Sequence, residues 1–220
     1  MKYLFVFDLD GTLYDLNDVL SANYDMQVDF LCSQKKMTQE EAISFFDDHH
    51  IFPEIRKDSM SATELFYKIG LNKKEWSDFR NLRFDEKRID LQKATTEDVL
   101  REYKCLGEII LLSSNAYCVI QRILNHLNIT PSFFDSIICS DRFPIDHPFK
   151  KKLALEYLSS QYGIDHSQML SIGDRFATDI EPMLSLGGRG VQILKPSSLI
   201  PLVNDIKNDT ICTCPEYIYY

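Results

Sequence analysis

Short, uninterrupted apolar runs recur along the chain and are its strongest structural signal. They predict buried strands over residues 3–7, 108–112, 136–139, 169–172 and 190–194. Because these runs are continuous rather than alternating, they are typical of a parallel sheet covered on both faces. Apolar residues at three- and four-residue spacing predict helices between the later strands, at 119–127, 151–162 and 181–187. This succession of strands and helices predicts a doubly wound α/β domain.

The first two predicted strands are separated by about a hundred residues whose patterns are helical. Within this stretch Thr38 stands at an expected helix N-cap before two glutamates, and Gly70 ends an apolar helical stripe. The stretch therefore predicts a helical module inserted between the strands. We place the core domain at residues 1–15 and 105–220 and the insertion at residues 16–104.

Composition and charge narrow the class of protein. Of the 220 residues, 45% are hydrophobic and 26% charged, which are ordinary values for a globular chain. The formal charge of −9 argues against a nucleic-acid or membrane-surface partner, because such proteins usually present basic patches. No run approaches the roughly eighteen apolar residues of a membrane span, and Asp8 interrupts the N-terminal run before a signal peptide could form.

Six cysteines are scattered along the chain without a zinc-type CxxC pair. We interpret them as buried thiols of a reducing compartment, which predicts a cytoplasmic protein. Cys212 and Cys214 lie close together, but no histidine or further cysteine is near them in sequence. This pair favours an ordinary C-terminal strand over a metal site.

Two aspartates, Asp8 and Asp10, come directly after the first predicted strand. In open α/β sheets, ligands bind beyond the carboxyl ends of the strands, so these side chains are candidates for chemistry. The Asp-Gly pair is also an ordinary turn signal, which leaves a structural role open. A calcium loop of the EF-hand type is excluded, since it would need glycine at Leu13 and glutamate at Val19.

Further polar residues follow two other predicted strands. Asp174 and Asp179 come after the strand at 169–172, and Ser114 and Asn115 follow the strand at 108–112. Carboxylates gathered at one sheet edge would repel one another unless neutralised, and hard oxygen ligands describe a magnesium site. A hydroxyl and free amides at a helix N-terminus suit an anion. Plain helix N-caps are the alternatives, both for Asp179 and for the Ser-Asn pair.

These groups, in this order, resemble the haloacid dehalogenase-like hydrolase superfamily along the whole chain. DLDGTLY is similar to the first motif of that family, GDRFATDI is similar to the fourth, and Ser114 corresponds to the hydroxyl of the second. The helical insertion looks like the first type of cap domain in the family. The resemblance thus implies a Rossmann-like, doubly wound parallel sheet with an inserted α-helical cap.

The third motif departs from the family pattern. Many relatives carry its lysine in a Lys-Pro-Asp-Pro run, and the same count here falls on Ile145. The lysine is therefore expected at the start of the helix at 151–162. Lys150 has the best spacing, and Lys151 is the second candidate. Such a lysine would neutralise nearby carboxylates and bind phosphate.

The resemblance also implies a mechanism and a cofactor. Asp8 would attack phosphorus and form an aspartyl-phosphate, while Asp10 would protonate the leaving oxygen and then activate water. Mg²⁺ would be held by Asp8, Asp174, Asp179 and, through its backbone carbonyl, Asp10. The implied phosphate-binding residues are Ser114, Asn115 and Lys150.

We therefore predict a magnesium-dependent phosphatase of a small phosphomonoester, such as a nucleotide or sugar phosphate. Asp10 favours phosphoryl chemistry over dehalogenation, because a halide leaves without a proton. A phosphomutase of the same superfamily and a non-catalytic phosphate-binding or regulatory protein stay open as alternatives. The expected partner is a small phosphorylated metabolite, with no nucleic acid and no membrane, and the oligomeric state is open.

Substrate choice is assigned to the inserted module, which would close over the site and expel water. Arg56 and Lys57 are candidate contacts to a second anionic group, and a solvated loop is the alternative. Tyr14 and Asp15, at the start of the insertion, are interpreted as structural.

Overall fold

The computed structural model describes residues 3–52, 62–143 and 150–220, and the chain forms two compact units. The first unit comprises Met1–Leu16 and Ile89–Tyr220, and the second comprises Asn17–Arg88. The second boundary thus lies before Ile89 and not after residue 104 as predicted. The reason is helix α5 (Glu97–Lys104), which packs against the sheet of the first unit and not among the inserted helices.

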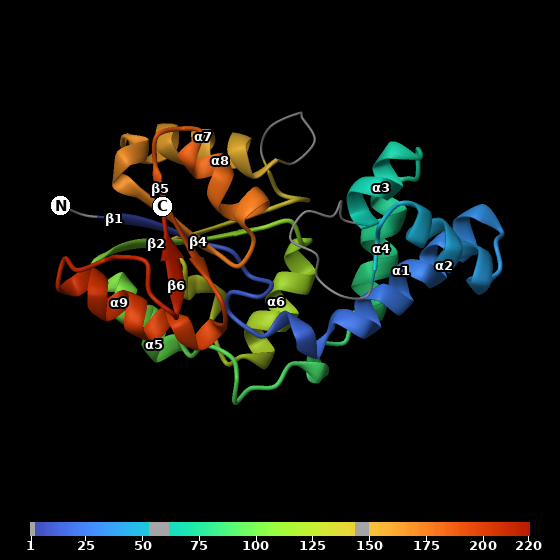
Figure 1. Cartoon of the computed structure of the whole chain (residues 1–220), viewed down its shortest axis with the longest axis horizontal. Helices are drawn as coiled ribbons and strands as arrows, with labels where there is room; N and C mark the ends of the chain where they lie inside the picture. The colour runs from blue at the N-terminus through green and yellow to red at the C-terminus, as the bar shows by residue number, and fades with distance from the viewer. Residues whose placement is uncertain (1–2, 53–61, 144–149) are drawn as a thin grey trace. The chain divides into compact units, whose positions relative to one another are not determined.

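A six-stranded sheet forms the centre of the first unit, in the order β3-β2-β1-β4-β5-β6 (Figure 1). Strands β1 to β5 run parallel, and β6 is antiparallel to β5. The five predicted strands are confirmed, and each observed strand end lies within one residue of the predicted end. The strands are β1 (Tyr3–Phe7), β2 (Gly107–Ser113), β3 (Ser136–Cys139), β4 (Met169–Gly173), β5 (Arg189–Ile193) and β6 (Tyr217–Tyr219).

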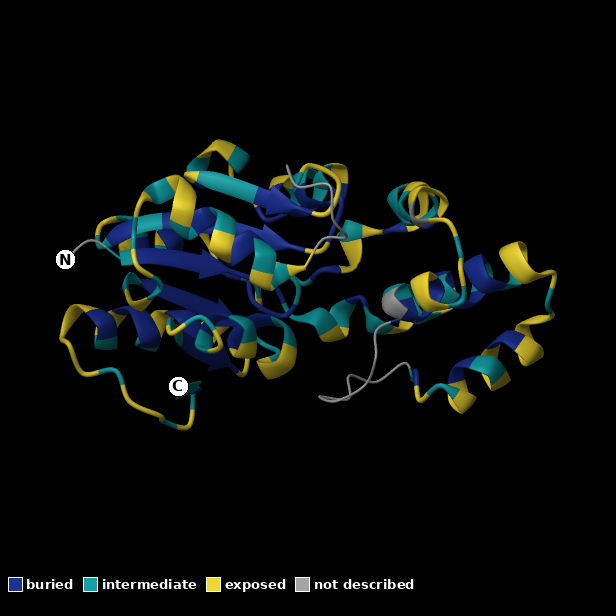
Figure 2. Ribbon diagram, turned by 90° about the horizontal axis from the view of Figure 1, so that it is seen from above, coloured by how far each residue is buried: buried dark blue, intermediate teal, exposed yellow. Residues whose placement is uncertain are grey.

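Helices cover both faces of this sheet, as its continuous apolar strands require (Figure 1). Helices α7 and α8 lie on one face, and α5, α6 and α9 lie on the other. Figure 2 shows the central strands buried along most of their length and the helices buried on their inner sides. Besides α5, the helices of this unit are α6 (Tyr117–His126), α7 (Lys151–Tyr162), α8 (Glu181–Leu184) and α9 (Leu199–Lys207).

Strand β1 has its side chains buried on both sides of the sheet. Leu4 and Val6 belong to a buried cluster with residues of α7 and α8. Phe5 and Phe7 alternate with them and therefore face the opposite layer. There the ring of Tyr103 in α5 meets both of them edge-on, at centroid distances of 5.3 and 5.0 Å. Burial on both faces holds the carboxyl end of β1 in a fixed place.

The order of the strands reverses between β1 and β4. From β1 the chain moves outward through β2 and β3, and then returns to the other side of β1 with β4 and β5. The connections that follow β1 and β4 therefore lead toward opposite edges of the sheet, and in open α/β sheets ligands bind at the carboxyl ends of the strands at such a point.

The second unit is helical in its described part, and its core is aromatic. Thr38 caps α2 in a capping box with Glu41, as the sequence predicts for Thr38. Phe30, Phe66 and Trp76 form a buried group with ring centroids 5.0 to 5.2 Å apart. The helices are α1 (Leu20–Lys35), α2 (Gln39–Asp48), α3 (Ala62–Lys68) and α4 (Lys73–Arg83).

The cysteines are less buried than predicted. Cys139 in β3 is buried, whereas Cys105, Cys118 and Cys212 are exposed, so the prediction of buried thiols is wrong for these three. Cys105 follows the last turn of α5, and Cys118 lies in α6 on its exposed side. Cys212 and Cys214 precede the C-terminal strand β6 and do not form it.

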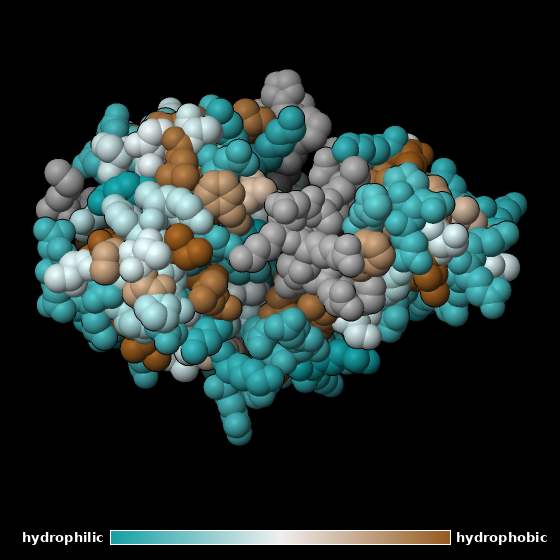
Figure 3. All heavy atoms as spheres, viewed as in Figure 1, coloured by the Kyte–Doolittle hydropathy of each residue, from teal (hydrophilic) through white to brown (hydrophobic). Residues whose placement is uncertain are grey.

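No helix in the described ranges is both long enough and apolar enough to span a membrane. On the face of the first unit drawn in Figure 3, apolar side chains are scattered among polar ones and not gathered into one patch. Scattered apolar side chains of this kind are normal on a protein surface.

Phe30→Ala should destabilise the second unit, because it removes a ring at the centre of its core. Substitutions of this type cost about 3–5 kcal/mol. Trp76 is the single tryptophan of the sequence, and its ring lies 5.0 Å from that of Phe30, so its fluorescence reports on this unit. We expect the urea transition followed by Trp76 fluorescence to move to clearly lower urea. Ile43→Ala is the control, since Ile43 is 41% exposed. Equal shifts for the two variants would contradict the assignment of this core.

Candidate active site

The loop after β1 places Asp8 and Asp10 at the carboxyl end of the sheet, beside β4. The backbone N–H of Asp8 donates to the carbonyl of Ile172 at 2.9 Å, which continues the pairing of β1 with β4. Gly11 then turns the chain with a φ of +78°, and a Cβ at this position would lie 2.4 Å from Oδ2 of Asp174. Glycine is required here for its conformation and for the close approach of the two loops.

The loop after β4 brings in Asp174 and Asp179. Asp179 lies in a π-helical turn, Phe176–Ile180, and its carboxylate accepts hydrogen bonds from the backbone N–H of Arg175 and the hydroxyl of Thr178, both at 2.9 Å. Helix α8 begins after this turn without a side-chain cap, so the alternative N-cap role of Asp179 is wrong. Single π-turns of this kind occur frequently at functional sites.

One carboxylate oxygen from each of Asp8, Asp174 and Asp179 lies within 4.8 Å of the other two. Asp8 and Asp179 are buried, and Oδ1 of Asp174 is a buried acceptor with no hydrogen-bond partner among the described residues. Buried acceptors are normally satisfied, so an atom of this kind calls for a missing partner. Three hard oxygen ligands around one point fit a divalent cation such as magnesium. This carboxylate trio can hold a metal ion.

Lys151 is the cation that the structure brings to the trio. Its Nζ donates to Oδ1 of Asp8 and, at 2.6 Å, to Oδ1 of Asp179, and its side chain is only 11% exposed. Lys150, the first choice from the sequence, is an exposed residue that precedes the first turn of α7. The structure therefore corrects the third-motif lysine from Lys150 to Lys151. The helix begins at Lys151 as predicted, and the lysine that reaches the aspartates is its first residue and not the residue before it.

Burial and repulsion shape the ionisation of these groups. Burial raises the pKa of Asp8 well above its ordinary value, and the nearby carboxylates add to this effect while Lys151 opposes it. Burial and then the charge of Asp179 raise the pKa of Asp174 to about 7. Burial alone would lower the pKa of Lys151, but the charges of Asp179 and Asp8 outweigh burial and raise it. Without a metal, the site holds protons tightly.

Asp10 is held apart from this trio by two uncharged donors. Nδ2 of Asn115 donates to its two carboxylate oxygens, at 3.1 Å to Oδ1 and 2.8 Å to Oδ2. The hydroxyl of Tyr14 donates to Oδ1 at 2.5 Å. The side chain of Asp10 is not one of the three that surround the candidate metal position. The predicted contribution of its backbone carbonyl to metal binding stays a prediction.

The phosphate-binding residues expected after β2 lie as follows. Ser114 is exposed directly after the strand, as expected of a residue that meets a ligand. Asn115 is buried, and its amide group contacts Asp10, so in this structure it supports a carboxylate. Arg56 and Lys57 lie outside the described residues.

Tyr14 is the residue of this site that the sequence reasoning missed. It was interpreted as structural, yet it is fully buried and donates to Asp10 four positions earlier. Its place within DLDGTLY was the available signal, but spacing alone does not reveal that the turn at Gly11 folds the tyrosine back onto the aspartate.

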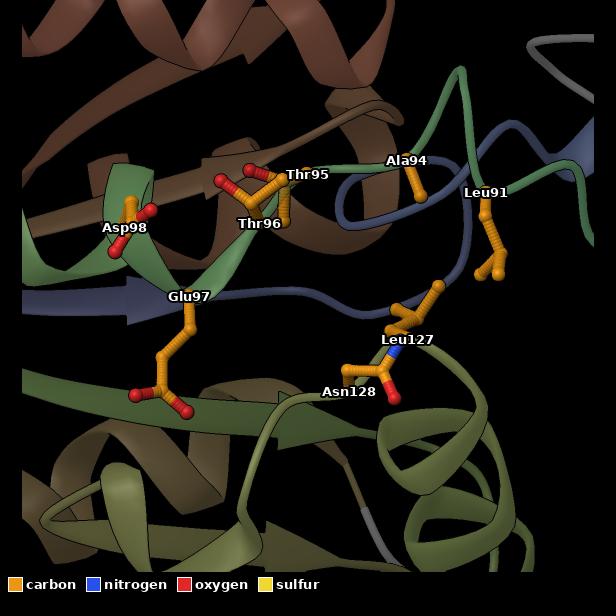
Figure 4. Close-up of a pocket in the computed structure, with 8 residues that line it drawn as sticks. All are labelled: Leu91, Ala94, Thr95, Thr96, Glu97, Asp98, Leu127 and Asn128. Atoms are coloured by element: carbon orange, nitrogen blue, oxygen red, sulfur yellow. The ribbon is translucent and has the colours of Figure 1, made fainter.

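A separate hollow of about 240 Å³ lies elsewhere in the first unit (Figure 4). Its walls come from the residues before and in the first turn of α5, such as Thr96 and Glu97, and from Leu127 and Asn128 after α6. None of the residues of the carboxylate site lines it.

Comparison with known protein families identifies the chain. The family model of haloacid dehalogenase-like hydrolases matches residues 4–187. The chain belongs to this family. A search of curated proteins found no match.

Many solved structures share the fold of this HAD-like hydrolase. One is a haloacid dehalogenase-like family hydrolase from Xanthomonas campestris, with 15% identity and a TM-score of 0.54 over 95% of this chain and 93% of the other. A HAD phosphatase from Thermococcus onnurineus is 17% identical, with a TM-score of 0.54 over 88% and 86% of the two chains. The HAD-hydrolase YfnB from Bacillus subtilis, bound to magnesium, is 14% identical, with a TM-score of 0.53 over 93% and 100%. At these identities the likeness establishes the fold.

Asp174→Asn should stabilise the metal-free protein at about pH 8 and have little effect at about pH 4. The folded-state pKa of about 7 lies above the ordinary 3.8, so the stabilising contribution of the protonated carboxyl is fully present below 3.8 and is lost as the pH rises from there through 7. An amide resembles the protonated carboxyl at every pH. For a gain on the order of 1 kcal/mol, the thermal midpoint rises by about 2–4 °C.

Thermal unfolding in a chelating buffer measures this difference. Asp209→Asn is the control, because Asp209 is exposed and its φ of 55° suits asparagine. Added magnesium should raise the midpoint of the wild type and of the control but not that of Asp174→Asn. A pH-independent difference, or an unchanged response to magnesium, would contradict the proposed ligand role.

Proposed function

We propose that this HAD-like hydrolase is a magnesium-dependent phosphatase that hydrolyses a small phosphomonoester in the cytoplasm through an aspartyl-phosphate. The observation that carries the proposal is the pairing of two different carboxylates at one strand end. Asp8 lies in a buried trio with a lysine, while Asp10 lies two residues away and is held by uncharged donors. The surroundings of Asp8 suit a nucleophile, and those of Asp10 suit a general acid and base.

In the first step, a carboxylate oxygen of Asp8 forms a bond to phosphorus as the bond from phosphorus to the ester oxygen breaks. The ester oxygen takes a proton from Asp10 and leaves as an alcohol. In the second step, water attacks the phosphorus of the aspartyl-phosphate and gives its proton to Asp10. The bond between phosphorus and Asp8 breaks, and inorganic phosphate leaves with both aspartates restored.

Lys151 supports both steps through its charge. Its ammonium group contacts Asp8 directly, so it can stabilise the carboxylate form of the nucleophile and reach a phosphate oxygen bound beside it. Magnesium, held by Asp8, Asp174 and Asp179, would supply further positive charge against the phosphate oxygens. Ser114, exposed at the end of β2, is the candidate hydroxyl donor to the phosphate.

Asp10 favours this reaction over dehalogenation. A halide ion is a stable leaving group and needs no proton, whereas an alkoxide must be protonated as it leaves. A carboxyl group positioned by Tyr14 and Asn115 can protonate a leaving alkoxide, whereas a leaving halide does not need it. The known fold accommodates the proposed chemistry, since its solved members include a phosphatase and a hydrolase bound to magnesium.

Substrate choice is assigned in this proposal to the helical unit, Asn17–Arg88. The carboxylate trio, the lysine and the Asp10 group all belong to the first unit, and they recognise only the phosphate and the metal. The remainder of the substrate must be distinguished by other residues. A small phosphorylated metabolite is the expected ligand.

A panel of phosphate esters tests the reaction class. Wild-type protein with magnesium should release inorganic phosphate from at least one nucleotide, sugar or other small phosphomonoester. Asp8→Asn should lower kcat by at least about 1,000-fold, because the nucleophile is lost. Asp209→Asn serves as the control and should keep wild-type activity.

The outcomes of this panel separate the alternatives. Isomerised sugar phosphate with little free phosphate would replace the proposal with a phosphomutase. Tight binding of a phosphorylated compound without turnover, unchanged in Asp8→Asn, would replace it with a non-catalytic binding protein. Retained phosphate release by Asp8→Asn would exclude the proposed nucleophile.

A comparison of Lys150 and Lys151 tests which lysine supplies the ammonium group at the carboxylate trio. Lys151→Ala should lower kcat/KM by about 100-fold or more, since it removes a buried charge that contacts two carboxylates. Lys150→Ala should stay within about twofold of the wild type, since Lys150 is exposed. Steady-state phosphate release measures both variants, and thermal unfolding verifies that both are folded. A larger loss in Lys150→Ala would reverse the assignment.

A further inference from the structure

We propose that Tyr14 and Asn115 are positioning residues that fix the Asp10 carboxylate so that its Oδ2 atom carries the transferred proton. This inference rests on the proposed phosphatase function and assigns its acid and base to one oxygen atom.

The hydrogen bonds to Asp10 are unequally divided between its two oxygens. Oδ1 accepts from the hydroxyl of Tyr14 at 2.5 Å and from Nδ2 of Asn115 at 3.1 Å. Oδ2 accepts from Nδ2 of Asn115 at 2.8 Å, and the described residues supply it with no further donor. A carboxylate oxygen has two lone pairs, so Oδ1 is fully occupied while Oδ2 keeps one free. The free lone pair is the place for an exchangeable proton.

Asn115 is rigidly placed for this task. Its side chain is buried, its backbone N–H donates to the hydroxyl of Ser113 at 3.2 Å, and its carbonyl accepts from the N–H of Ser140 at 3.3 Å. It is therefore anchored between the ends of β2 and β3. Because its one amide nitrogen reaches both oxygens of Asp10, it fixes the plane of the carboxylate.

Tyr14 adds a second fixed donor from the other side of the turn. Its ring is fully buried, and residues Asp10 and Tyr14 form a backbone bridge across the turn at Gly11. The preceding carbonyl, that of Leu13, accepts from the N–H of Thr95 at 2.8 Å. The hydroxyl is thus presented to Oδ1 by a braced backbone, which distinguishes the two oxygens of Asp10.

During ester cleavage, the proton moves from Oδ2 of Asp10 to the leaving oxygen as the phosphorus–oxygen bond breaks. During hydrolysis, Oδ2 accepts the proton of the attacking water. Tyr14 and Asn115 keep their own protons in both steps and act only through Asp10. Their loss should therefore slow those steps in which Asp10 moves a proton.

The experiment compares two phosphate esters that differ in their need for an acid. Glycerol 2-phosphate has an alkoxide leaving group that must be protonated, whereas p-nitrophenolate leaves without a proton at neutral pH. The ratio kcat/KM reports the first irreversible step, which is transfer of the phosphoryl group to Asp8. We expect Tyr14→Phe and Asn115→Ala to lower kcat/KM about 10-fold or more for glycerol 2-phosphate, a share of the 100- to 10,000-fold that acid–base catalysis contributes. For p-nitrophenyl phosphate, kcat/KM should fall clearly less than for glycerol 2-phosphate in the same variant.

Tyr103→Phe is the matched control. Tyr103 is also a fully buried tyrosine whose hydroxyl donates a hydrogen bond, in its case to the carbonyl of Leu199 at 2.8 Å. Its removal should affect the two esters equally, whatever it does to stability. An equal loss for both esters in Tyr14→Phe and Asn115→Ala would overturn the inference while the phosphatase proposal stands. If the wild type released phosphate from neither of these two esters nor from any ester of the wider panel, both the inference and the phosphatase proposal would be overturned.

Discussion

Repulsion between carboxylates at one sheet edge is the constraint that organises this molecule. Asp8, Asp174 and Asp179 present oxygens within 4.8 Å of one another in a poorly hydrated place, where like charges are costly. Lys151 offsets part of that charge, but burial and, to a lesser degree, the neighbouring carboxylates still raise the pKa values of Asp8 and Asp174. The trio can therefore bind a cation. The rest of the fold must supply the stability that keeps the three carboxylates close together.

The sheet supplies that stability by making β1 and β4 neighbours. Their parallel pairing extends to Asp8, whose N–H binds the carbonyl of Ile172, so the two loops begin side by side. Gly11 then lets the loop after β1 approach the loop after β4, since a Cβ at this position would lie 2.4 Å from Oδ2 of Asp174. Gly173 at the end of β4 leaves room for Asp179 of its own loop, whose Cβ would lie 2.4 Å from a Cβ at Gly173. The aromatic contacts of Tyr103 with β1 hold the strand from behind. Distant apolar packing thereby fixes the spacing of the charges.

Much of this arrangement could be predicted from the sequence, because it depends on local patterns. Continuous apolar runs located the five parallel strands, and residues directly after strand ends must meet at one edge, which is how Asp8, Asp174 and Asp179 were found. The errors have a different origin. The start of α7 at Lys151 was predicted correctly, but which of Lys150 and Lys151 reaches the aspartates depends on side-chain direction, and neighbouring residues on a helix point about 100° apart. The unit to which α5 belongs is decided by its packing against the sheet, and no local sequence pattern encodes this packing.

The two aspartates after β1 differ through their partners more than through their position. Asp8 contacts a lysine ammonium and belongs to a trio suited to a metal, so a cation bound there would join Lys151 in favouring the anion that acts as a nucleophile. Asp10 receives only uncharged donors, from Tyr14 and Asn115, among the described residues. These donors fix the direction of the carboxylate, which suits a group that must meet first the leaving oxygen and then a water molecule. Two chemically identical side chains can therefore take opposite roles in one reaction because the turn at Gly11 delivers them to different partners.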